Sequence, residues 1–203
     1  QPNYGESFNL NVNLKNISQD PYTASGVTAQ LSTQSEYATV VNGSIVAGNI
    51  SPDQTVALDN AFSVNIANNV PDQTAIVFTI NISGSYGGQT YSWSQNFTIK
   101  ANAPVLSIGN ITIDDGGAGI PGVLDPGETA NAQLVVRNIG HAAIQNVTVG
   151  FISNSSYLSV TNSTFQIASL AVDGQSQALF EVSALANTPL ETVAPVVLSA
   201  ESG

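Results

Sequence analysis

One strongly alternating segment occurs twice in the chain, and this repeat constrains the fold more than any other feature. Residues 5–18 (GESFNLNVNLKNIS) match residues 127–140 (GETANAQLVVRNIG), which lie 122 positions later. In the first copy, apolar and polar residues alternate without a break from Phe8 to Leu14. Such a period of two is typical of a β-strand with one face in a core and one face in solvent.

Further matches follow both copies of this segment, whereas no stretch of the chain has a helical periodicity. Short strands with turn signals at regular spacing are typical of immunoglobulin-like sandwiches. We therefore predict an all-β chain with two tandem immunoglobulin-like β-sandwich domains, residues 1–102 and 103–203. The later matches are 26–32 with 146–152, Phe62 with Phe180, Val64 with Val182, and Pro71 with Pro189.

The two copies begin and end at different points of the repeat. Residues 105–114 (VLSIGNITID) give the second copy a first strand that the first copy lacks. Residues 89–100 (QTYSWSQNFTIK) give the first copy a last strand that the second copy lacks. In each copy, the strand that would lie next to the missing one is predicted to be a sheet edge that pairs readily with a further strand. Three explanations remain open: a window of a longer repeat array, strand exchange between subunits, and domains that fold with fewer strands.

The composition excludes several classes of function. Only 8% of the residues are charged, against roughly 25% in an average globular protein, and the net charge is −11. With Lys15, Lys100 and Arg137 as the only basic residues, we expect no nucleic-acid partner. No apolar run approaches the ~18 residues of a membrane span, so we predict no direct membrane insertion. The absence of cysteine excludes disulfides, thiolate metal sites and cysteine nucleophiles.

The sequence is rich in the glycosylation pattern N-x-S/T. It contains nine such triplets, where random placement of these residues would give about four. One explanation is that an Asn- and Ser-rich strand protein forms them by composition; the other, which we favour, is glycosylation of an extracellular protein. The asparagines are Asn16, Asn42, Asn49, Asn81, Asn96, Asn110, Asn146, Asn154 and Asn162.

Residues 124–149 (LDPGETANAQLVVRNIGHAAIQNVTV) resemble the opening of CARDB-type and S-layer-associated immunoglobulin-like domains of archaeal and bacterial cell-surface proteins. The shared features are a PGE turn, an alternating strand, an N-x-G turn and an A-x-x-N-V-T strand. The resemblance covers roughly residues 5–66 and 105–185, and the first copy departs from it where Tyr4 replaces the proline. It implies an extracellular, non-catalytic spacer, adhesive or layer-forming module.

The acid- and glycine-rich segment 114–128 (DDGGAGIPGVLDPGE) is a candidate calcium loop. Calcium prefers six to eight oxygen ligands, and four carboxylates lie here, although the EF-hand spacing is not met. The alternative is a strand-to-strand loop whose glycines and prolines set its turns. The candidate ligands are Asp114, Asp115, Asp125 and Glu128, with Asn3 and Glu6 as the vestige of this loop in the first copy.

Two other features are candidate sites, one for glycan binding and one for catalysis. Tyr91 and Trp93 share one face of the predicted last strand of the first domain, where they form a glycan platform or else simply pack at the core or edge. His141, the only histidine, lies in a turn where no nucleophile or carboxylate is placed beside it. We therefore predict that the protein is not an enzyme and has no cofactor other than calcium.

These observations favour a non-catalytic, extracellular structural protein. It would be a subunit or repeat segment of a cell-surface filament, layer or stalk that assembles through β-sheet edges, with strand exchange as one route. Its predicted partners are copies of itself or neighbouring repeats, together with surface glycans. The alternative is an accessory adhesive or glycan-binding module of a secreted enzyme such as a peptidase.

Overall fold

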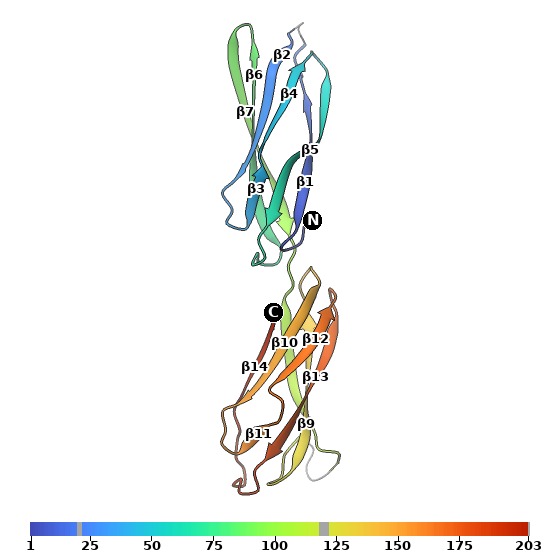
Figure 1. Ribbon diagram of the computed structural model, residues 1–203, viewed down its shortest axis with the longest axis vertical. Helices are drawn as coiled ribbons and strands as arrows, with labels where there is room; N and C mark the ends of the chain where they lie inside the picture. Colours follow the sequence, from blue (N-terminus) through green and yellow to red (C-terminus); the bar gives the residue numbers. More distant parts are fainter. Residues whose placement is uncertain (20–21, 118–121, 203) are drawn as a thin grey trace. The chain divides into compact units, whose positions relative to one another are not determined.

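The computed structural model describes residues 1–19, 22–117 and 122–202 (Figure 1). Over these residues the regular secondary structure is entirely β-strand. None of this described part forms a helix long and apolar enough to cross a membrane. The chain divides into two compact units, Gln1–Ala103 and Pro104–Gly203, so the boundary lies one residue from the predicted position.

Unit 1 is a sandwich of two antiparallel sheets. The three-stranded sheet has the order β1-β5-β3, and the four-stranded sheet has the order β4-β2-β6-β7. Strands β1 to β6 alternate between the two sheets, so that both sheets contribute to one core, and the chain then adds β7 as a hairpin partner of β6. The strands are β1 (Ser7–Lys15), β2 (Ala24–Thr33), β3 (Ala38–Asn42), β4 (Ser44–Ile50), β5 (Thr55–Ile66), β6 (Thr74–Tyr86) and β7 (Gln89–Ala101).

Unit 2 repeats this architecture with a different distribution of strands. Its four-stranded sheet has the order β11-β13-β9-β8, and its three-stranded sheet has the order β12-β10-β14. The strands are β8 (Leu106–Asp114), β9 (Thr129–Asn138), β10 (Ile144–Ser153), β11 (Leu158–Val160), β12 (Thr164–Leu170), β13 (Gln175–Ala184) and β14 (Val196–Ser202).

Superposing the two strand orders confirms the predicted fold. The sheet β3-β5-β1 corresponds to β11-β13-β9, but only β9 carries a further neighbour, β8. The sheet β4-β2-β6 corresponds to β12-β10-β14, but only β6 carries a further neighbour, β7. Unit 1 therefore lacks the first strand of the repeat and unit 2 lacks the last, as the sequence repeat predicted.

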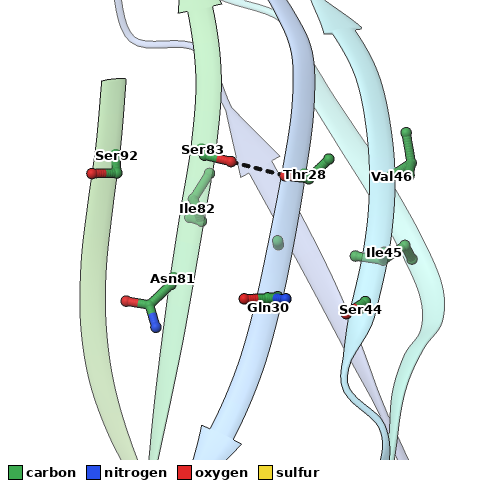
Figure 2. Close-up of a pocket in the computed structure, with 10 residues that line it drawn as sticks. Thr28, Gln30, Ser44, Ile45, Val46, Asn81, Ile82, Ser83 and Ser92 are labelled. Carbon is green, nitrogen blue, oxygen red and sulfur yellow. Dashed lines mark hydrogen bonds between the residues drawn. The ribbon is translucent and has the colours of Figure 1, made fainter. Parts of the chain in front are cut away.

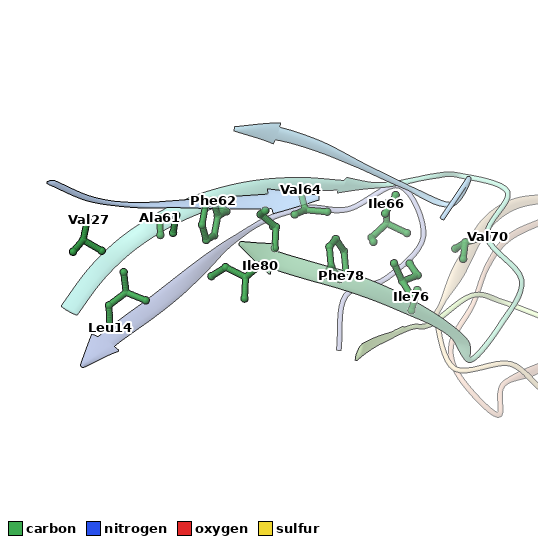
Figure 3. Close-up of a cluster of buried hydrophobic side chains, with 14 of the residues drawn as sticks. Leu14, Val27, Ala61, Phe62, Val64, Ile66, Val70, Ile76, Phe78 and Ile80 are labelled. Atoms are coloured by element: carbon green, nitrogen blue, oxygen red, sulfur yellow. The ribbon is translucent and has the colours of Figure 1, made fainter. Parts of the chain in front are cut away.

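The inward-facing residues of both sheets form one core in each unit. In unit 1, Phe62, Val64, Ile76 and Phe78 are fully buried (Figure 3). The Phe78 ring stacks on Phe97 from β7, with ring centroids 5.5 Å apart. The residues that the repeat aligned with Phe62 and Val64 are Phe180 and Val182, and these lie in the core of unit 2. Burial of this apolar area is the main stabilising contribution to each sandwich.

Candidate functional site

Among the described residues, no strand pairs with the edge of β1 that faces away from β5, and we call this edge the β1 open edge. β1 pairs with β5 alone, whereas its counterpart β9 pairs with both β13 and β8. The inward side chains of β9 are fully buried along its length, but those of β1 are half-buried except for Leu14. Without a strand at this edge, backbone groups and inward side chains of β1 remain accessible to a partner.

The edge of β14 that faces away from β10 is open in the same way, and we call it the β14 open edge. β14 pairs with β10 alone, whereas its counterpart β6 pairs with both β2 and β7. The inward residues Val196, Leu198 and Ala200 are only half-buried, although they belong to the core cluster of unit 2. In unit 1, the β6 residues at the same register positions are Phe78, Ile80 and Ile82; with β7 alongside β6, Phe78 and Ile80 are buried and Ile82 is half-buried.

A buried asparagine fastens the start of β8 to unit 2. Asn138 is 0% exposed, and its Nδ2 donates to the carbonyl oxygens of Ala142 (2.8 Å) and Ala171 (3.2 Å). Its Oδ1 accepts from the backbone N–H of Gly140 and from that of Val105, at 3.1 and 3.2 Å. Ile139 N–H then donates to Val105 O at 2.8 Å, which completes a two-bond contact with the incoming strand.

Asn16 occupies the same position in unit 1 but makes only part of this contact. Its Nδ2 donates to the carbonyl oxygens of Tyr22 and Ile50, both at 3.0 Å, and its Oδ1 accepts from Ser18 N–H at 3.1 Å. Among the described residues, no incoming backbone N–H reaches Asn16 Oδ1, and Ile17 N–H donates to no carbonyl. No described residue therefore uses, in unit 1, the hydrogen-bonding positions that hold β8 in unit 2.

A hollow of about 460 Å³ lies beside the end of β1. Leu14 and Ile17 line it from β1 and the segment that follows, and Ile82 and Trp93 line it from the facing sheet. Ile17 is 80% exposed and Trp93 is 55% exposed. Apolar side chains that face one another across an uncovered space are features of a binding surface rather than of a closed core.

Tyr91 and Trp93 lie on the inward face of β7, because they pair with Gly84 and Ile82 of β6. Their ring centroids are 6.4 Å apart with an interplanar angle of 25°, and Tyr91 is 47% exposed. A second pair, Tyr22 and Tyr86, has its ring centroids 4.2 Å apart at the same end of the β6–β7 hairpin. All four residues are exposed, and we refer to the two pairs together as the aromatic patch.

A second, polar hollow of about 490 Å³ lies on the outer face of the four-stranded sheet of unit 1, and no sequence motif indicated it (Figure 2). Thr28 and Ser83 hydrogen-bond across it at 2.9 Å. Gln30, Ser44 and Asn81 add uncharged polar groups, and no lining residue is charged. Without an acid, a base or an activated nucleophile, this surface offers hydrogen bonds but no catalytic group.

The four predicted calcium ligands are all described by the structure, and their side chains support turns. Glu128 Oε2 accepts from Asp125 N–H at 2.7 Å, and Glu6 Oε2 accepts from Asn3 N–H at 2.7 Å in the other unit. Asp114 Oδ1 and Asp115 Oδ1 accept from the glycine N–H groups two positions later. No three acidic or histidine side chains of the described residues gather into a metal-binding group, and residues 118–121 lie outside the described part. Calcium binding stays a prediction.

The nine predicted glycosylation sites differ in accessibility. Asn16 is half-buried and its Nδ2, the atom that would carry the sugar, is engaged with two carbonyl oxygens. The other asparagines are exposed: Asn42, Asn49, Asn81, Asn96, Asn110, Asn146, Asn154 and Asn162. Geometry therefore favours glycans on these eight positions over Asn16.

His141 and Lys15 are the remaining candidate residues, and both lie on the surface. His141 is exposed in the turn after Gly140. Lys15 forms an exposed ion pair with Asp53 at 3.7 Å, an interaction that contributes little to stability.

No protein-family model matches the chain, and no curated protein matches it. Solved structures match it at a distance. Red sea bream transglutaminase has 14% identity and a TM-score of 0.33, and the match covers 100% of this chain but only 28% of that protein. A protein of unknown function from Porphyromonas gingivalis W83 has 11% identity and a TM-score of 0.29, with 88% and 75% of the two chains covered.

A third similar structure is the CsuC–CsuE chaperone–tip adhesion subunit pre-assembly complex from Acinetobacter baumannii. Its identity is 7%, its TM-score is 0.28, and the match covers 97% of this chain and 93% of that one. Because these TM-scores are low, the immunoglobulin-like assignment rests on the strand order and not on the individual matches.

Proposed function

We propose that the protein is a non-catalytic structural component of an extracellular assembly, such as a cell-surface filament, layer or stalk. The observation that carries this proposal is the pair of open edges, one on β1 in unit 1 and one on β14 in unit 2. Each exposes a half-buried apolar row together with backbone groups that pair readily with a further strand.

The two edges are different surfaces, so a contact that joins them is head-to-tail. Head-to-tail contacts produce rings or open filaments, depending on the rotation between subunits. The low content of charged residues suits close contact because little electrostatic repulsion opposes it. The resemblance of residues 124–149 to CARDB-type and S-layer-associated domains supports the same location on a prokaryotic cell surface.

The experiment compares the mass of the protein in solution, by light scattering and electron microscopy, for matched variants. Val12→Lys and Leu198→Lys each place an inward charge at one open edge, a device that disfavours edge pairing. Val46→Lys is the control, because Val46 is 73% exposed on β4. We expect polymers from the parent and the control but not from either edge variant. Monomers at all concentrations, or polymers from every variant, would contradict assembly through the open edges.

The aromatic patch supports a second function, adhesion to glycans. Exposed aromatic rings provide amphipathic contact surface, and the stacked pair Tyr91 and Trp93 leaves its faces accessible. Titration with oligosaccharides should change Trp93 fluorescence if this function holds, and Tyr91→Ala should weaken the binding while Val46→Ala does not. Equal binding by the two variants would exclude the patch as the glycan site.

A further inference from the structure

We propose that the β1 open edge is an acceptor site for an extended segment of the β8 type, with isoleucines at the positions of Ile108, Ile111 and Ile113. The segment would add to the sheet as a fourth strand, antiparallel to β1, in the register that β8 has on β9. This inference rests on the proposed assembly through sheet edges and adds the chemistry of the partner and its position.

The first argument is the internal template. In unit 2, Ile108 pairs with Val136, Ile111 with Leu134 and Ile113 with Ala132, with a bulge at Gly109–Asn110. The repeat aligns Val136, Leu134 and Ala132 with Leu14, Val12 and Leu10. A segment with isoleucines at the β8 positions would thus lie along these three β1 side chains, and Leu10 and Val12, now half-buried, would become buried as their β9 counterparts are.

The second argument is the unused hydrogen-bonding groups at the end of β1. In unit 2, Val105 donates its N–H to Asn138 Oδ1 and accepts from Ile139 N–H. In unit 1, Asn16 is already oriented by its two bonds to Tyr22 O and Ile50 O. Its Oδ1 and the neighbouring Ile17 N–H are therefore preorganised to receive the same backbone contact from an incoming strand.

The third argument is the uncovered apolar space beside this edge. The hollow is lined by Leu14, Ile17, Ile82 and Trp93. In unit 2, the half-buried β8 residues Ile108, Ile111 and Ile113 pack against the core. The apolar side chains of a docked segment would enter the hollow in the same manner and shield Trp93 from water.

The β8 of the same chain is not free to act as the occupant. It already pairs with β9 from Leu106 to Asp114, and its departure would open unit 2. A separate β8-type segment avoids this cost. Specificity would come from the apolar pattern with its two-residue bulge, because a shift by one residue would turn the isoleucines toward solvent.

The test uses a synthetic peptide with the sequence of residues 103–114 (APVLSIGNITID) and the full chain. We expect saturable binding with a blue shift of Trp93 emission. Amide hydrogen exchange should slow over residues 7–17 and stay unchanged over residues 196–202. A control peptide, with asparagine at the positions of Ile108 and Ile111, should bind about tenfold more weakly or worse, equivalent to a loss of about 1.4 kcal/mol or more.

Two variants of the chain locate the site. Val12→Lys should weaken binding of the peptide by about tenfold or more through an inward charge. Ile17→Pro removes the N–H that the docked strand would use, while Ile17 donates to no carbonyl among the described residues, so the unit should still fold. Unchanged exchange over β3 and β5 will verify folding of both variants.

Failure of the peptide to saturate, equal binding of the control peptide, or binding unaffected by both variants would overturn the inference. Protection of residues 7–17 in the chain alone, lost on dilution, would assign the edge to a second copy instead. If the peptide fails to bind while the chain still forms polymers that Leu198→Lys abolishes, the acceptor site is excluded and the proposed structural function stands.

Discussion

The buried asparagine of unit 2 provides a quantitative test of the structure, because unit 1 contains a matched residue in a less buried setting. Asn138→Ala removes hydrogen bonds to the carbonyls of Ala142 and Ala171 and from the N–H groups of Gly140 and Val105. At least two of these groups would be left buried and unpaired, at about 1–3 kcal/mol each. The expected loss of about 2–6 kcal/mol is a large fraction of the ~5–15 kcal/mol that stabilises a typical domain.

Asn16→Ala removes fewer bonds at a position that water reaches. Its Nδ2 bonds to Tyr22 O and Ile50 O and the bond from Ser18 N–H are lost, but solvent can replace part of them. We therefore expect a loss of about 1–2 kcal/mol in unit 1, which is clearly smaller than the loss in unit 2.

The assay follows both units in one urea titration. Trp93 is the only tryptophan and lies in unit 1, so its fluorescence reports that unit. Amide hydrogen exchange over β9 and β13 reports unit 2. For Asn138→Ala, the free energy of unfolding of unit 2, obtained from amide exchange, should fall clearly. For Asn16→Ala, the free energy of unfolding of unit 1, obtained from the Trp93 transition, should fall by less. Equal losses in the two units would refute the argument that β8 and its buried asparagine make unit 2 depend on this contact.

Three further outcomes are expected. Phe78→Ala should lower the stability of unit 1 by about 3–5 kcal/mol, measured by the Trp93 transition, because Phe78 is fully buried against Phe97; a loss below 1 kcal/mol would contradict this packing. Peptide mass spectrometry of protein from its native source should find glycans on the exposed asparagines but not on Asn16. A sugar on Asn16 of the folded protein, or an unmodified chain mass of 20.9 kDa, would contradict the glycan assignment. If calcium binds the acidic loop, a hundredfold excess over its Kd should stabilise unit 2 by about 2.7 kcal/mol, and Asp115→Asn should reduce the gain; no shift with either protein would exclude the site.

The open edges also explain why the two units differ in burial although their sequences repeat. β1 and β9 carry the same alternation, yet only β9 is buried along its whole inward face. β9 has β8 alongside it, whereas β1 has larger inward residues, Phe8 and Leu10 in place of Ala130 and Ala132, and pairs with β5 alone among the described strands. A partner strand at β1 is therefore expected to increase the protection of residues that the isolated chain leaves half-exposed.

The sequence alone determined the fold class, the tandem repeat and the strand that each unit lacks. Period-two alternation and turn residues are local signals, and a repeat within one chain aligns its own elements. It also placed Tyr91 and Trp93 on one strand face, because residues two apart on a strand necessarily share a face.

Only the tertiary structure decided which groups come together and which remain accessible. The sequence marked Asn16 as a glycosylation site and Glu128 as a metal ligand, but folding places Asn16 Nδ2 against two carbonyl oxygens and Glu128 Oε2 on the turn backbone. Such roles depend on backbone groups far away in the chain, such as Ile50 O for Asn16. A local residue pattern carries no information about these partners. Nor does it indicate the hollow beside β1, because this hollow forms where two sheets face each other and β1 has no neighbouring strand on one side.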